Sequence, residues 1–294
     1  MKALFVVNPI AGGRNRLKKI TEAVRRLLKT EEGVYEIRVT RDKPHARELS
    51  KRAVEMGFDS VVACGGDGTV NDVAAPLVNT GVALGIIPAG SGNGLAASLG
   101  IPFDIPEAVG LLKKHKIRDI DVGVVCNRYF FSTAGFGFDA ELSKRYNEGK
   151  FSRKLRGILP YIPLAIFEFA KYRPEPVLVK IGANHIKTTP FILTAANTER
   201  YGAGAVIAPG ACPDDGLLDV CIVPHPGIIK APDAANKLLG GKIDEMEGYK
   251  CFRGDKVEIV RKEKTAIHVD GEPFEWGGDI KITTLYRKLK VLVA

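Results

Sequence analysis

The feature that most constrains the fold is a regular alternation of two hydrophobic patterns in the N-terminal part of the chain. Short apolar runs, typical of buried strands, alternate four times with segments in which apolar residues recur at helical spacing. The expected strands are 3–7, 35–39, 60–63 and 82–87, and the expected helices are 17–28, 44–56, 70–78 and 95–99. This alternation predicts an α/β domain with a parallel sheet. The carboxyl ends of such strands face one crevice, so the loops after them are predicted to form a ligand site.

The loop after the third expected strand, residues 64–72, reads Cys-Gly-Gly-Asp-Gly-Thr-Val-Asn-Asp. Its three glycines, Gly65, Gly66 and Gly68, allow a ligand to approach the backbone closely. The helix that follows offers N–H groups and the positive end of its dipole, which suit phosphate. Asp67 would repel phosphate unless a cation lay between them, so the loop predicts Mg²⁺ as well as phosphate. The alternative is a tight turn in which Asp67 only caps the helix.

A second glycine-rich loop follows the fourth expected strand, at residues 88–94, and reads Pro-Ala-Gly-Ser-Gly-Asn-Gly. Glycine-rich turns are common, so this loop alone indicates little. Together the two loops predict a phosphate site with two walls. Neither the Walker A pattern nor the Rossmann dinucleotide pattern occurs in the sequence.

The pattern changes near residue 120, where short β-like runs separated by turns begin. These runs are 129–132, 177–181, 191–195, 218–223, 256–260, 265–269 and 280–285. They predict an antiparallel, β-rich sandwich as a second domain. We therefore expect domains at 1–123 and 124–294, with the last residues able to pack back on the first domain. A helical insertion interrupts the β-rich part, with a basic run at 144–156 and an apolar run at 157–167.

The amino-acid composition limits the classes of binding partner that we expect. The chain has 43 Lys and Arg against 34 Asp and Glu, a net charge of +9, which favours nucleotides or an anionic membrane surface. Aromatic residues are only 7%, and no basic helix interleaved with aromatics is evident, so nucleic acid is not an expected partner. The basic run 144–156 is either a solvated face or, with the apolar residues after it, a membrane-docking surface.

Compartment and membrane topology also follow from the sequence. Five cysteines without Cys-x-x-Cys spacing indicate reduced thiols, with neither zinc nor disulfides expected. No signal peptide is recognised, and the apolar run at 157–167 is too short to span a bilayer. We expect a cytoplasmic protein, peripheral at the inner face of the membrane.

Motifs in both halves resemble the diacylglycerol kinase catalytic family, which includes bacterial lipid kinases, sphingosine kinases and ceramide kinases. The first half has Asn8-Pro9 with Gly12, and the two glycine loops. The second half has Ala-Gly-Phe-Gly-Phe-Asp-Ala at 134–140, Ala-Pro-Gly-Ala at 208–211, Asp-Gly-Leu-Leu-Asp at 215–219 and Asp-Gly-Glu at 270–272. The match covers nearly the whole chain in the order of the family. It implies a nucleotide domain shared with NAD kinases and phosphofructokinases, and a β-rich lipid domain.

The resemblance also implies roles for individual residues. ATP would be held by Asn8, Thr40, Gly65, Gly66, Gly68, Thr69, Gly90, Ser91 and Asn93. Asp67 and Asp215 would belong to a magnesium network. Asp270 would be the general base, with Glu272 assisting it, while Asp139 is a candidate contact for the substrate.

One position departs from the family pattern. Soluble bacterial diacylglycerol kinases usually carry Asp where this chain has Gly94, so its loop looks closer to sphingosine- and ceramide-type kinases. The resemblance therefore predicts transfer of the ATP γ-phosphoryl group to a lipid hydroxyl, with diacylglycerol expected and a sphingoid base or another lipid alcohol as the alternative. An NAD kinase, or a lipid- or nucleotide-binding protein without turnover, are further alternatives. A homodimer is possible.

The residues in the second half also have simpler interpretations. Asp270-Gly271 is an ordinary two-residue hairpin turn between apolar runs. Asp214-Asp215-Gly216 is a common turn, and Asp139 could bond only to its own backbone.

Overall fold

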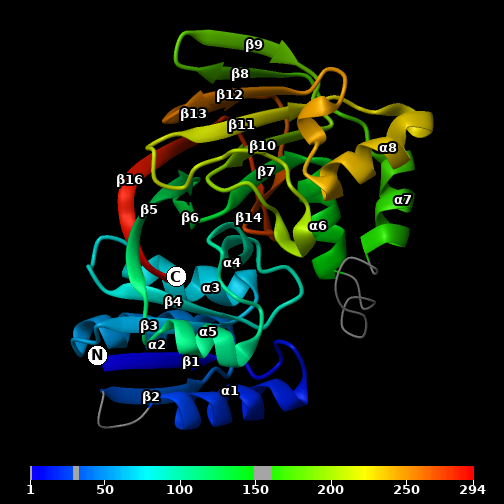
Figure 1. Cartoon of the computed structure of the whole chain (residues 1–294). Helices are drawn as coiled ribbons and strands as arrows, with labels where there is room; N and C mark the ends of the chain where they lie inside the picture. Colours follow the sequence, from blue (N-terminus) through cyan, green and yellow to red (C-terminus); the bar gives the residue numbers. More distant parts are fainter. Residues whose placement is uncertain (1, 29–32, 149–160) are drawn as a thin grey trace. The chain divides into compact units, whose positions relative to one another are not determined.

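The computed structural model describes residues 2–28, 33–148 and 161–294 (Figure 1). The chain divides into two compact units. The first comprises Met1–Val122 together with Arg287–Ala294, and the second comprises Gly123–Tyr286. The boundary predicted from the sequence follows residue 123. In the structure the chain enters the second unit at Gly123, and Arg287–Ala294 return to the first.

The first unit is built on a parallel sheet. Its strands are β1 (Lys2–Val7), β2 (Val34–Val39), β3 (Ser60–Gly65) and β4 (Ala83–Pro88). They lie in the order β2–β1–β3–β4, and Phe5 pairs with Ile37 on one side and Val62 on the other. The end of β16 (Ile280–Val293) adds a parallel pair, Val291 with Leu84. The predicted parallel α/β domain is thus confirmed.

Helices connect these strands (Figure 1). They are α1 (Arg14–Leu27), α2 (Lys43–Glu55), α3 (Asp67–Ala74) with a 3-10 turn at Ala75–Leu77, α4 (Gly94–Ser98) and α5 (Ile105–Leu111). Helices α1 and α5 pack together, and Ile20 and Val109 join Phe5 in one apolar core. Helices α2 and α3 also pack together, and the Ser50 hydroxyl donates to the Val73 carbonyl at 2.7 Å.

Helix α5 is absent from the helices expected from periodicity. Its start nevertheless has a recognisable cap. The Asp104 carboxylate accepts the backbone N–H of Glu107 at 3.1 Å, and Pro106 lies in the first turn, where its missing N–H costs nothing.

The second unit is an antiparallel sandwich. One sheet contains β7 (Thr133–Gly137), β10 (Ile192–Ala196), β11 (Leu218–Val223), β12 (Lys250–Gly254), β14 (Thr265–Val269) and β15 (Glu272–Trp276), in the order β12–β11–β10–β7–β14–β15. The other sheet contains β8 (Val177–Ile181), β9 (Asn184–Thr188), β13 (Lys256–Val260) and the first part of β16. Phe136, Val220 and Ile267 of the first sheet share a core with Val179 and Ile259 of the second. The predicted β-rich sandwich is confirmed.

The remaining strands are β5 (Lys116–Val125) and β6 (Arg128–Phe130), and the remaining helices are α6 (Phe138–Glu148), α7 (Tyr161–Lys171) and α8 (Gly227–Gly240), with 3-10 turns at Gly202–Gly204 and Ile243–Glu245. A second apolar cluster joins Phe138 and Phe191, whose rings stack at 4.5 Å, to Cys221. Alternate residues of β11 therefore serve two cores, since Val220 points to the sandwich and Cys221 to the helices.

None of the helices in the described ranges combines the length and apolar character needed to cross a bilayer.

Candidate active site

The first wall of the candidate site forms where β1 and β3 end. Asn8 directly follows β1, and its backbone N–H donates to the Cys64 carbonyl at 3.0 Å. The Asn8 side-chain amide donates to the Thr69 hydroxyl, also at 3.0 Å. Thr40 follows β2, is buried, and donates its N–H to the Val7 carbonyl at 2.9 Å. The ends of three strands thus bring Asn8, Thr40 and Thr69 to one edge of the sheet, as the sequence analysis expects.

The two glycine loops meet at backbone distance. A Cβ on Gly90 would lie 2.3 Å from the Cα of Gly66, and a Cβ on Gly65 would lie 2.5 Å from the Thr69 side chain. Gly66 is also the N-cap of α3, so the N–H groups of the first turn, where Gly68 lies, follow it directly. A side chain at Gly90 would force the two loops apart, whereas one at Gly65 would displace Thr69 within the first loop, so both positions require glycine.

Asp67 joins the two walls. Its carboxylate accepts the backbone N–H of Asn93 and that of Gly94, both at 2.7 Å. Asn93 is itself in the left-handed region, at φ 57° and ψ 44°, and its side chain makes two hydrogen bonds with the backbone of Gly90. The two bonds to the Asp67 carboxylate are charge-assisted, and such bonds are roughly twice as strong as neutral ones. Asp67 therefore positions the second loop, a role that its place in the first loop does not reveal. Ser91 lies exposed between Gly90 and Asn93.

A basic hollow of about 910 Å³ adjoins the glycine loops. It is lined by Gly12, Asn15, Arg16, Lys19, Glu22, Ala23, Arg25, Arg26 and residues 103–106. Arg16 donates from Nη1 to the Ala89 carbonyl at 3.0 Å, and so contacts the start of the second loop. The excess of cations over Glu22 and Asp104 suits a polyanion. Arg16 is not among the predicted site residues, although its position after the turn at Gly12 is the signal that could have found it.

In the second unit, Asp270 and Gly271 form a two-residue hairpin turn. Val269 pairs with Glu272, and both turn residues have positive φ, 48° and 81°, as a type I′ turn requires. The Asp270 carboxylate also accepts backbone N–H groups from another part of the chain. These come from Phe131, Ser132 and Thr133, at 2.8–3.3 Å. The turn is thus anchored to the segment before β7. Glu272, the predicted assistant, is the first residue of β15.

Asp139 lies in the first turn of α6 and belongs to a polar cluster. One of its carboxylate oxygens accepts the Tyr201 hydroxyl at 2.7 Å and the Thr194 hydroxyl at 3.1 Å, and contacts His268 Nε2 at 3.1 Å. Burial is the main cause that raises the pKa of Tyr201 well above its ordinary value, so the tyrosine donates its proton to the carboxylate. Asp139 does make a local backbone contact, since it accepts the N–H of Ala140. Its contacts with Tyr201, Thr194 and His268 show that this local contact is not its only one.

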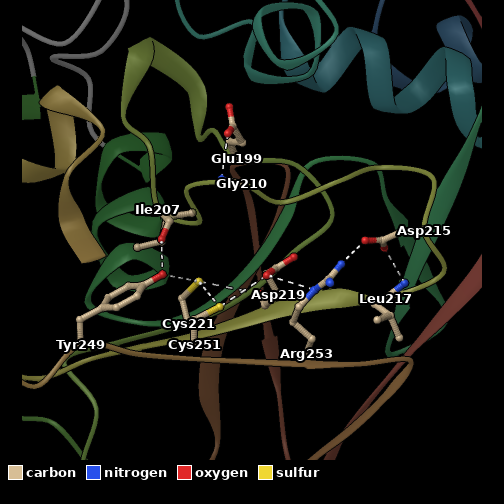
Figure 2. Close-up of polar contacts among 10 residues, drawn as sticks. All are labelled: Glu199, Ile207, Gly210, Asp215, Leu217, Asp219, Cys221, Tyr249, Cys251 and Arg253. Atoms are coloured by element: carbon tan, nitrogen blue, oxygen red, sulfur yellow. Dashed lines mark hydrogen bonds and ion pairs between the residues drawn. The ribbon is translucent and has the colours of Figure 1, made fainter. Parts of the chain in front are cut away.

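Asp215, predicted to belong to a magnesium network, forms an ion pair with Arg253 and accepts the backbone N–H of Leu217 at 3.0 Å (Figure 2). Arg253 also lies 3.6 Å from Asp219, on the strand that follows the Asp215 turn. Burial raises the pKa of Asp219, and Arg253 opposes this shift. Asp215 is therefore held in place by a cation of the protein itself.

A magnesium site can be judged from these contacts. The described ranges contain no group of three or more His, Cys, Asp or Glu side chains that could hold a metal ion. Mg²⁺ is, however, often held by one or two carboxylates together with substrate phosphates and water. Each carboxylate oxygen has two lone pairs, so accepting an N–H group does not exhaust it. Taken separately, the carboxylate of Asp67 and that of Asp215, which Arg253 already pairs with, are each ligands of the kind that Mg²⁺ takes.

The basic run predicted at 144–156 lies partly outside the described residues, as do 157–160 of the apolar run. Within the described part, Lys144 pairs with Glu275 at 2.7 Å and Arg145 pairs with Glu141 at 2.8 Å. These two cations match the interpretation of a solvated, ion-paired face.

Comparison with known proteins identifies the family. Residues 2–125 match the diacylglycerol kinase catalytic domain, and residues 132–286 match the YegS C-terminal NAD kinase beta sandwich-like domain. A diacylglycerol kinase of Mycobacterium tuberculosis is 33% identical over 265 residues, which cover 88% of this chain and 84% of that protein. A Pseudomonas putida protein named "Probable lipid kinase YegS-like" is 31% identical over 244 residues, covering 82% of this chain and 80% of that protein.

The fold is also shared with a solved structure. A diacylglycerol kinase from Bacillus anthracis str. Sterne has a TM-score of 0.77 and 21% identity, covering 100% of this chain and 97% of that chain. Taken together, the glycine loops, the sandwich and these matches show that the chain belongs to the diacylglycerol kinase family of lipid kinases. It is therefore a kinase that uses ATP and a lipid acceptor.

Proposed function

We propose that this kinase transfers the γ-phosphoryl group of Mg-ATP to the free hydroxyl of diacylglycerol, giving phosphatidic acid. The observation that carries the proposal is the pair of glycine loops in backbone contact, joined by Asp67. Phosphoryl transfer requires positioning and charge neutralisation more than covalent chemistry by the protein. Two loops rich in backbone N–H groups, next to a basic hollow, supply both.

In this proposal the first unit holds the nucleotide. The phosphates lie against the backbone of Gly65, Gly66, Gly68 and Gly90, with Asn8, Thr40, Thr69, Ser91 and Asn93 around them. Asp67 and Asp215 would contribute carboxylate oxygens to Mg²⁺, and the bound ion would neutralise phosphate charge. Asp67 then has two functions, since it also fixes the second loop through the N–H groups of Asn93 and Gly94.

Asp270 would accept the proton of the lipid hydroxyl as the new P–O bond forms, with Glu272 assisting. The contacts of Asp270 with Phe131, Ser132 and Thr133 support this role, because they hold the carboxylate in one orientation. They equally support a purely structural role, and Asp270→Asn separates the two.

The relatives differ in the lipid that their names give. The M. tuberculosis relative is named for diacylglycerol, whereas the P. putida relative is named only as a lipid kinase. Gly94 favours the alternative, a sphingoid base or another lipid alcohol. Asp139 would contact the head group in either case.

Peripheral contact with an anionic membrane is part of the proposal. Two pairs of large apolar side chains support it, because they are largely exposed on helices of the second unit. These are Ile166 and Phe167 on α7, and Ile228 and Ile229 on α8. Exposed apolar residues near cationic segments are typical of surfaces that dock on membranes.

The experiment is a phosphoryl-transfer assay with radiolabelled ATP and a panel of acceptors. Diacylglycerol, sphingosine, ceramide and a polyprenol are presented in mixed micelles, with NAD as the control acceptor, each with and without Mg²⁺. We expect labelled phosphatidic acid that requires Mg²⁺ and little label on NAD. Preference for sphingosine would overturn the choice of lipid and leave the kinase assignment intact, and transfer without divalent cation would contradict the magnesium network.

A further inference from the structure

Two cysteines face each other across neighbouring strands of the second unit. The antiparallel register of β11 and β12 pairs Cys221 directly with Cys251. The two sulfur atoms are 3.8 Å apart, and the Cys221 thiol donates to the Cys251 sulfur (Figure 2). Directly paired residues of antiparallel strands have Cα atoms about 4.5–5.5 Å apart, which lies within the range of about 4.4–6.8 Å seen in disulfides. Rotation of the side chains can therefore close the remaining gap without moving the backbone.

The two thiols differ in access. Cys221 is fully buried between the sheet and the helices, whereas Cys251 is an exposed residue on β12, the strand at one end of the six-stranded sheet. An oxidant from solution therefore meets Cys251 first. The geometry matches that of a reactive thiol with a second thiol poised behind it.

The contacts around the pair also favour reaction at Cys251. The Tyr249 hydroxyl donates to the Cys221 sulfur at 3.1 Å, and Cys221 in turn donates to Cys251. The hydrogen bond from Cys221 is the main cause that lowers the pKa of the Cys251 thiol, whereas partial burial and the nearby Asp219 carboxylate oppose the shift. The thiolate is the nucleophilic form of cysteine.

We propose that Cys221 and Cys251 form a reversible disulfide, in which Cys251 reacts first with a hydroperoxide and Cys221 then resolves the product. The Cys251 sulfur attacks one oxygen of the hydroperoxide and the O–O bond breaks. The other oxygen takes up the thiol proton and leaves as water, or as an alcohol from an organic hydroperoxide, and Cys251 becomes a sulfenic acid. The Cys221 sulfur attacks the Cys251 sulfur, the S–S bond forms, the S–O bond breaks, and water leaves. Two thiols are oxidised and one hydroperoxide is reduced, so electrons and atoms balance.

The disulfide would lie beside a charged group of the candidate site. The Cys251 thiol also lies 3.6 Å from the Asp219 carboxylate, to which it donates in the reduced protein. Arg253, two residues along β12, pairs with both Asp219 and Asp215 (Figure 2). Oxidation removes the thiol that donates to Asp219. It also links β12, the strand that carries Arg253, covalently to β11. The modification site is thus connected to Asp215 by three successive contacts, Cys251 with Asp219, Asp219 with Arg253, and Arg253 with Asp215.

The test needs no turnover, so its outcome is independent of the proposed function. The full chain is reduced with dithiothreitol, freed of reductant and treated with hydrogen peroxide. It is then digested without reduction, and the peptides are mapped by mass spectrometry. We expect a linked peptide containing Cys221 and Cys251, which dithiothreitol converts back to two thiols. Cys251→Ser should abolish the linked peptide.

Cys212→Ser is the matched control, because Cys212 is a partly exposed thiol that also donates to a carboxylate, that of Asp214 at 3.1 Å. This variant should keep the Cys221–Cys251 link. In Cys221→Ala, Cys251 should accumulate as a sulfenic acid that dimedone traps. If Cys221→Ala does not fold, the comparison of the wild type with Cys251→Ser still tests the proposal. The proposal is overturned if wild-type Cys251 becomes a stable sulfenic or sulfinic acid while Cys221 stays reduced, or if peroxide links Cys251 between two chains.

Discussion

The carboxylate of Asp67 accepts the backbone N–H of Asn93 at 2.7 Å, which joins the first turn of α3 to the loop after β4. The other oxygen of the same carboxylate accepts the N–H of Gly94. This side chain reinforces the backbone contact between the two loops, in which the Gly65 carbonyl accepts the N–H groups of Ala89 and Gly90 at 2.8 and 3.2 Å. The geometry of the proposed phosphate site therefore depends partly on Asp67 before any cation binds.

Asp67→Ala should abolish most phosphoryl transfer and also lower stability. The loss of two hydrogen bonds to a charged group costs about 1.5–3 kcal/mol each in typical proteins. We therefore expect a lower midpoint of unfolding in urea, with far-UV circular dichroism retained at low temperature. Asp67→Asn keeps the shape but loses the charge, and should stay inactive at any Mg²⁺ concentration. Near wild-type turnover by either variant would remove Asp67 from the site.

Asp270→Asn tests the general base. Asparagine suits a type I′ turn, but its amide offers one acceptor oxygen to three N–H groups, so we expect a lower Tm as well. If Asp270 is the base, turnover measured well below the Tm should fall by at least ~10²-fold with little change in ATP affinity. Full activity of the folded variant would restrict Asp270 to anchoring the turn, and Glu272 and Asp215 would be tested next.

Asp139→Asn should destabilise the second unit, since Tyr201, Thr194 and His268 all contact one carboxylate oxygen. The expected loss is about 1–3 kcal/mol, measured by chemical unfolding. Tyr201→Phe is the control, because it removes one donor and keeps the carboxylate. A changed order of preference among lipid acceptors in Asp139→Asn, but not in Tyr201→Phe, would support a contact with the substrate. An unchanged order in both would leave Asp139 a structural role.

Membrane binding should depend on charge and salt. Each Lys or Arg near an anionic surface contributes about 1 kcal/mol, which salt screens. Co-sedimentation with vesicles should increase with the fraction of anionic lipid and decrease with salt. Replacing Lys150, Arg153, Lys154 and Arg156 by Gln should weaken it, whereas Lys18→Gln, at an exposed position on α1 that pairs with Glu22, should not. Equal binding to neutral vesicles would contradict the electrostatic contribution.

The sequence predicts the fold well because its signals are local. Strands and helices of the first unit follow from periodicity, and the turn at Asp270-Gly271 follows from its residue types. The contacts that define the site join distant residues, such as Asp67 with Gly94 and Asp270 with Ser132. Periodicity holds no information on which backbone N–H a carboxylate meets. For the same reason the cysteines could be counted in the sequence, while the pairing of Cys221 with Cys251 required the register of two strands.

The most direct measurement of the central claim is the affinity for Mg-ATP of Gly90→Ala, determined by titration calorimetry. The added methyl group would lie 2.3 Å from the Cα of Gly66, so the two loops must separate. Gly110→Ala is the control, because it lies in α5 with nothing within 4 Å of the new methyl group. We predict that Gly90→Ala loses at least ~10-fold in affinity, the equivalent of about 1.4 kcal/mol, while Gly110→Ala binds like the wild type. Wild-type affinity in a folded Gly90→Ala protein would contradict a phosphate site between these loops.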